Sequence, residues 1–151
     1  MPAADDQYRP SPEDVGAITL NRTVDKVGVQ TGTFTADTRP TDSQVEILID
    51  KAMEDVGCAI GYDIPEGLWD RARHVVSVRT AMLIELTLYA HEIRSGISPY
   101  PEYKALYEDE VACLASAVQA AEAGQSLDDA ASAGLARWGY PAPSYIYGGV
   151  N

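Results

Sequence analysis

The fold class is decided by the stretch from residue 41 to residue 61, which reads TDSQVEILIDKAMEDVGCAIG. Thr41 followed three positions later by Gln44 is a capping box, a pattern that begins a helix. Apolar residues then recur at spacings of three and four until Gly61, and they are Val45, Leu48, Ile49, Ala52, Met53, Val56, Ala59 and Ile60. The stretch therefore predicts a helix of roughly 30 Å with one apolar stripe.

A second, longer helix is predicted from about residue 65 to about residue 94. Pro65 and Glu66 suit a first helical turn, and apolar residues keep the helical period from Leu68 to Ile93. Residues 81–90 are apolar on nearly every side, although Glu85 interrupts them. Each helix of a three-helix monomer keeps a solvated face, so this stretch needs additional cover. A neighbouring subunit would supply it, and so would the N-terminal arm or the C-terminal tail.

The rest of the chain completes a mainly α fold. Residues 95–101, with two prolines, predict a loop, and a third helix follows with apolar positions from Tyr103 to Ala121. Ser11-Pro12-Glu13-Asp14 predicts a short early helix, and the threonine-rich segments 19–24 and 27–35 predict a β-hairpin. We therefore expect an N-terminal arm with a short β-hairpin (1–40), a three-helix antiparallel bundle (41–124), and a short helix with an extended C-terminal tail (125–151).

The final fourteen residues, WGYPAPSYIYGGVN, differ in composition from the bundle. They carry no charged side chain but hold four of the twelve aromatic residues, together with prolines and glycines. Such a segment does not form a core alone. Large, rigid aromatic side chains on a stiffened extended chain are typical of a docking peptide, so docking is favoured over a tail that folds back on its own bundle.

Composition limits the classes of function. The formal net charge is −12, which disfavours sequence-reading DNA-binding proteins because negative potential repels phosphate backbones. No apolar run is long enough to span a membrane, and the acidic, proline-containing N-terminus does not resemble a secretion signal, so we expect the chain to remain in the cytoplasm. Cys58 and Cys113 have no metal-ligand spacing, and we expect both to be reduced in a core.

The residues that commonly carry catalysis show no convergent pattern. His74 and His91 lie about 25 Å apart along the predicted second helix, so they do not share a site within one subunit. Phosphate loops, nucleophile elbows and dinucleotide fingerprints are not found, and the carboxylates are expected to face solvent. We therefore expect a protein that is not an enzyme and that needs no cofactor and no metal.

Three arginines of the second helix, Arg71, Arg73 and Arg79, lie within nine residues of an acidic chain. They predict ion pairs that align a neighbouring subunit, and Ile84 and Leu88 in the apolar stretch are predicted to contact the same neighbour. The simpler interpretation of the arginines is a salt-bridged seam.

Several of these segments resemble the head-to-tail adaptor (connector) proteins of long-tailed bacteriophages, especially those that infect actinobacteria. The similarity begins with FTADTRPT at residues 34–41 and the helix that follows, and continues through Asp63-Ile64-Pro65 and RTAMLIEL at residues 79–86. It extends over the helix from Tyr103 to Leu114, so it covers about residues 34–120. The threonine-rich arm before Phe34 departs from the pattern and leaves the role of residues 1–33 open.

The resemblance implies a structural virion protein of the neck. Copies would form a ring, of dodecamer type, beneath the portal protein, joining the capsid to tail or head-closure proteins. The C-terminal segment would insert into the portal, and its candidate docking residues are Trp138, Tyr140, Pro141, Tyr145, Ile146 and Tyr147. Double-stranded DNA would pass through the ring without sequence-specific binding during ejection, past candidate lumen acids Glu102, Glu108 and Asp109.

A second class of protein fits the helical pattern less well. A small terminase-like subunit is also a helical ring protein that handles phage DNA, but it should present a basic recognition face. The third helix instead opens with acids, which have the wrong sign for a DNA groove.

Overall fold

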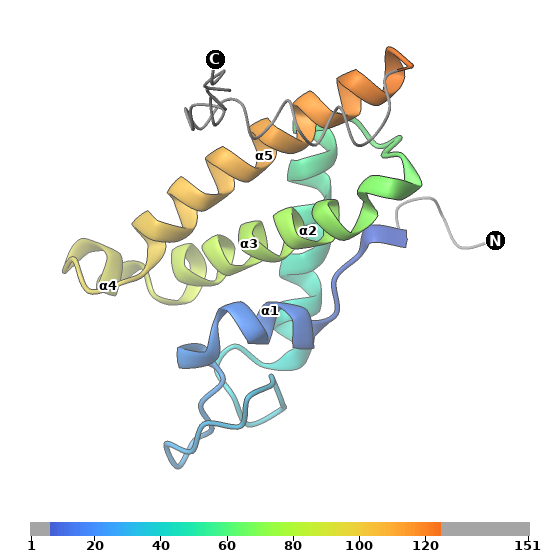
Figure 1. The fold of residues 1–151 in the computed structure, drawn as a ribbon. Helices are drawn as coiled ribbons and strands as arrows, with labels where there is room; N and C mark the ends of the chain where they lie inside the picture. The colour runs from blue at the N-terminus through green and yellow to red at the C-terminus, as the bar shows by residue number, and fades with distance from the viewer. Residues whose placement is uncertain (1–6, 125–151) are drawn as a thin grey trace, which may run out of the picture.

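The computed structural model describes residues 7–124 and is mainly helical. Its elements are α1 (Pro12–Ile18), the 3-10 turn η2 (Leu20–Arg22), α2 (Asp42–Ile60), the 3-10 turn η3 (Glu66–Leu68), α3 (Trp69–Leu88), α4 (Ala90–Arg94) and α5 (Tyr100–Glu122). Figure 1 shows α3 at the centre, with α5 running antiparallel to it on one side and α1 on the other. Helix α2 crosses behind α3 instead of running alongside it.

Helix α2 begins and ends where the sequence predicts. The Thr41 hydroxyl accepts a hydrogen bond from the Gln44 N–H, and the Gln44 side chain accepts one from the Thr41 N–H, so the capping box is complete. Gly61 ends the helix at φ +92°, a conformation that favours glycine. Most of the predicted stripe is buried, from Val45 to Val56, because this face packs against α3.

The predicted second helix is not continuous. It opens with the turn η3, runs as α3, and breaks at Tyr89, where φ is −125° and ψ is 26°, before α4 continues to Arg94. The segment from 81 to 94 contains no glycine or proline, so the local sequence gives no sign of the break. The N-terminal arm contacts Tyr89 directly, through Arg22 and the carbonyl of Arg39.

The N-terminal arm (residues 7–40 as described) contains the predicted short helix but not the two predicted strands. Helix α1 carries a complete capping box between Ser11 and Asp14. Farther on, the structure has a single antiparallel bridge between Val24 and Gln30 in place of a hairpin. The Asp25 carboxylate accepts the N–H groups of Val27 and Val29 and closes a tight loop, so local side-chain bonds replace a strand ladder.

The arm also packs against α3 and contacts the apolar stretch 81–90 at Glu85 and Tyr89. Tyr8, Val15 and Phe34 are buried in the same core cluster as α2, α3 and α5. Helix α1 packs directly on α3, as Figure 1 shows. Of the three sources of cover, the N-terminal arm of the same chain is the one found within residues 7–124.

Helix α5 confirms the third predicted helix but starts earlier. Tyr100 and Pro101 belong to its first turn, where a missing proline N–H costs no helical bond, so the predicted loop is shorter than expected. The buried residues of α5 lie in its later turns and are Leu114, Ala117 and Val118. The short helix and the tail predicted after residue 125 lie outside the described residues.

Candidate functional site

A buried charged cluster joins the arm to α3, α4 and the loop before α5. Arg22 donates from Nε to Glu85 Oε1 (2.7 Å) and from Nη2 to Glu85 Oε2 (2.8 Å), and the same Nη2 donates to Glu92 Oε2 (2.6 Å). The Ser98 hydroxyl donates to Glu85 Oε2 (2.6 Å). Glu85 is fully buried and Arg22 is 9% exposed. We call Arg22, Glu85, Glu92 and Ser98 the Arg22 cluster.

The ring of Tyr89 lies against this cluster. The guanidinium carbon of Arg22 is 3.6 Å from the ring centroid, a cation–π contact, and the Tyr89 hydroxyl donates to the carbonyl of Arg39. Two points of the arm therefore hold the residue at which the helix breaks.

The electrostatics of the cluster follow from these bonds. Burial alone would lower the pKa of Arg22, but hydrogen bonds and charges from Glu85 and Glu92 outweigh it and raise the pKa. The bond from Arg22 lowers the pKa of Glu92 below its ordinary value. Both carboxylates already accept charge-assisted bonds, so the geometry suits holding the arm in place better than proton transfer.

Sequence reasoning missed this cluster. It placed the carboxylates at solvent-facing positions, which is wrong for Glu85. An acid in the middle of the apolar run 81–90 was the available signal, because a buried carboxylate needs a cation. Its partner Arg22 lies 63 residues earlier in the chain, and the sequence around Arg22 does not indicate this pairing.

The three arginines predicted to contact a neighbour each meet an acid of the same chain. Arg71 lies 3.7 Å from Glu110, Arg73 lies 2.9 Å from Asp70, and Arg79 lies 2.8 Å from Asp55. The simpler interpretation, a salt-bridged seam, describes these contacts. Ile84 is fully buried in the core of its own chain, so it has no surface to offer a neighbour in this conformation.

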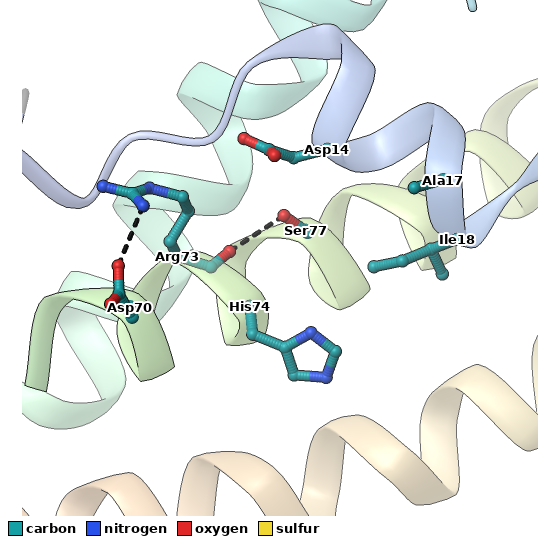
Figure 2. A pocket seen from close by; sticks show the side chains of 7 residues that line it. All are labelled: Asp14, Ala17, Ile18, Asp70, Arg73, His74 and Ser77. Carbon is teal, nitrogen blue, oxygen red and sulfur yellow. Dashed lines mark hydrogen bonds and ion pairs between the residues drawn. The ribbon is translucent and has the colours of Figure 1, made fainter. Parts of the chain in front are cut away.

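A shallow hollow lies between α1 and α3 and has a volume of about 330 Å³. Figure 2 shows its lining, formed by Asp14, Ala17, Ile18, Asp70, Arg73, His74 and Ser77. Arg73 donates to Asp70, and Ser77 donates to the Arg73 carbonyl (2.8 Å). The His74 ring points away from the Asp70–Arg73 pair. These polar groups bind one another and do not converge on a shared point in the hollow.

A second hollow is apolar and lies between α2 and α3. It has a volume of about 190 Å³ and is lined by Gln44, Ile47, Leu48, Thr87 and Leu88, which we call the α2–α3 patch. The Ile47 side chain is 67% exposed, the highest value for a large apolar residue of α2 or α3. Leu88, predicted as a neighbour contact, lies here at the surface and is half-buried.

The remaining candidate residues lie at the surface or beyond the described range. His74 and His91 are exposed, as expected for solvated histidines. Cys58 is exposed, and the prediction that it lies in a core was wrong, because it is outside the set of buried α2 residues, which ends with Val56 and Gly57. Cys113 is half-buried. The acids Glu102, Glu108 and Asp109 are exposed on α5. The six docking residues of the tail lie outside the described residues.

Within residues 7–124, no group of three or more histidine, cysteine, aspartate or glutamate side chains is placed to hold a metal ion. Among the helices of the same range, none has both the length and the apolar character needed to cross a membrane. No family model, curated protein or solved structure matches the chain.

Proposed function

We propose that the chain is a head-to-tail adaptor of a long-tailed bacteriophage, a virion neck protein that acts by assembly and not by catalysis. Copies form a ring, of dodecamer type, beneath the portal protein and join the capsid to the tail. DNA passes through the ring, and the C-terminal tail docks into the portal. The similarity of residues 34–120 to that family motivates the proposal, and the mainly helical fold agrees with it.

The observation that carries the proposal is the α2–α3 patch. Ile47 is exposed on a helix whose other apolar residues are mostly buried, and it borders a hollow with Leu48 and Leu88. A partner that covered these apolar side chains would remove them from water, which is favourable. In the proposed ring, a second copy of the chain covers it.

Charge supports the proposed passage for DNA. Eight of the ten basic residues between 7 and 124 form ion pairs with acids of the same chain. Arg39 and Arg94 are the other two. Glu102 and Asp109 are exposed acids of α5 that form no ion pair within the described range. A surface with few free cations and many acids repels phosphates, so DNA slides past it.

The same observation disfavours the alternative, a small terminase-like ring protein that binds DNA. Such a protein needs free lysine and arginine side chains to replace the counterions of the phosphates. A gel-shift assay with duplex DNA at moderate salt separates the two functions. The adaptor should not shift the DNA, and tight binding would favour the terminase-like function.

Ring formation is tested by Ile47→Lys, which places a charge in the α2–α3 patch. Electron microscopy of the unmodified protein mixed with the portal protein of its phage should show a symmetric ring stacked on the portal, and the variant should not form it. Val27→Lys is the matched control, because Val27 is an 82% exposed apolar residue in the arm loop. If Ile47→Lys assembles normally, the patch is not the contact.

Portal attachment is tested by deleting residues 138–151. The shortened chain should keep its helical circular dichroism spectrum, because helices α1 to α5 and their buried core lie within residues 7–124, but should lose portal binding. Unchanged binding would remove the assigned role of the tail.

A further inference from the structure

The helix break at Tyr89 lies in a segment that favours an uninterrupted helix. Residues 86–94 read LTLYAHEIR, with no glycine or proline and with several strong helix formers. Across the break, the N–H of Glu92 turns to the Tyr89 carbonyl (2.9 Å) instead of the carbonyl of residue 88. Continuing the helix would restore such bonds, so another interaction must compensate for their loss at the break.

Arg22 is the contact that spans the break. In a continuous helix the Cα atoms of residues 85 and 92 are about 10 Å apart along the axis, with residue 89 on the same face between them. Here one nitrogen of Arg22 binds both Glu85 and Glu92, and its guanidinium lies over the Tyr89 ring. Bending the helix at Tyr89 brings both carboxylates to that nitrogen.

We propose that the joint at Tyr89 is a conformational latch, meaning a joint with two states, and that Arg22 is its pin, the residue that holds one of them. The docked N-terminal arm breaks the helix at Tyr89, and release of the arm lets residues 69–94 form one helix. The released helix would be about 39 Å long. The N–H of Glu92 bonds the Tyr89 carbonyl in the docked conformation and would bond the Leu88 carbonyl in a continuous helix, so the joint has two alternative bonding states. This latch does not depend on the proposed ring.

The latch connects the arm to the α2–α3 patch. Thr87 and Leu88, which line the patch, directly precede Tyr89. A change at the joint therefore changes the shape of the patch, and docking of the arm sets which shape a partner meets.

A local cause competes with this explanation. The Thr87 hydroxyl donates to the Leu83 carbonyl (2.6 Å), and such a bond within a helix often bends it. Thr87→Val removes this bond while keeping the shape of the side chain, so it separates the local cause from the tertiary one.

The test is NMR of the full chain, using Cα chemical shifts of residues 86–92 and exchange rates of the amides of residues 90 and 91. Glu92→Met removes the bridge to α4 without lowering helix propensity, and Arg22→Met with Glu85→Gln removes the pin without leaving a buried charge. Both variants should show helical shifts at Tyr89 and roughly fivefold slower exchange of the two amides. Lys26→Met, at an ion pair within the arm, is the control and should change neither.

The latch would be overturned by a break at Tyr89 that persists both in Glu92→Met and in the double variant Arg22→Met with Glu85→Gln. If Thr87→Val then straightens the helix, the local bond is the cause of the break. If the double variant does not fold, Glu92→Met decides alone, because Glu92 is at the surface of the cluster and its replacement leaves Arg22 paired with Glu85.

Discussion

Replacing Arg22 by methionine should destabilise the fold more than replacing its partner Glu85 by glutamine. Arg22→Met leaves the fully buried Glu85 carboxylate with the Ser98 hydroxyl as its remaining hydrogen-bond donor. Breaking a buried pair from one side costs about 3–5 kcal/mol, because the other charge is left without compensation. The free energy of unfolding of a domain of this size is about 5–15 kcal/mol, so the variant should lose a large share of its stability.

Glu85→Gln leaves a different situation. Arg22 keeps the Glu92 carboxylate, at 2.6 Å, and its contact with the Tyr89 ring. The expected cost is that of hydrogen bonds to one charged group, about 1.5–3 kcal/mol. Arg22→Met with Glu85→Met should be more stable than Arg22→Met alone by about 2 kcal/mol, because the buried charge is gone.

Urea unfolding followed by circular dichroism at the helical band measures these free energies, with Lys26→Met as a surface control. The reasoning would be refuted if Arg22→Met costs less than about 1 kcal/mol, or if Glu85→Gln costs more than Arg22→Met. A double variant less stable than Arg22→Met would also refute it, because the uncompensated charge would then not be the cause.

Three further outcomes are expected. Gly57→Ala should destabilise α2 although alanine is the better helix former, because the added methyl overlaps the Tyr62 ring; in a Tyr62→Ala background the same change should stabilise by about 1 kcal/mol, both read by urea unfolding. Thr41→Ala should cost about 1 kcal/mol through loss of the α2 cap, and an unchanged unfolding midpoint would contradict the capping geometry. The lowered pKa of Glu92 means that the stabilisation by this carboxylate is complete above its ordinary pKa of 4.5 and is lost as pH falls through the lower pKa of the folded state. The free energy of unfolding should therefore fall less steeply with decreasing pH in Glu92→Gln than in the unmodified protein, and equal slopes would contradict the pairing.

The elements predicted best are those whose signals are local. The start of the short helix at Ser11, the capping box at Thr41, the apolar stripe of α2 and the period of α5 all depend on residues within four positions of one another. Side-chain bonds within the arm were also local, but threonine forms turns as well as strands and aspartate favours turns, and the structure has one bridge in place of the predicted hairpin.

The sequence by itself determined that the chain forms capped amphipathic helices, because the helical period and the caps are written within single turns. Only the tertiary structure decided which segment covers the second face of α3, where the long helix breaks, and that Glu85 is buried against Arg22. The physical reason is distance along the chain. The buried charge pair joins residues 63 positions apart, and Tyr89, where the helix breaks, is contacted from 50 and 67 positions away, so no local pattern in the sequence indicates these contacts.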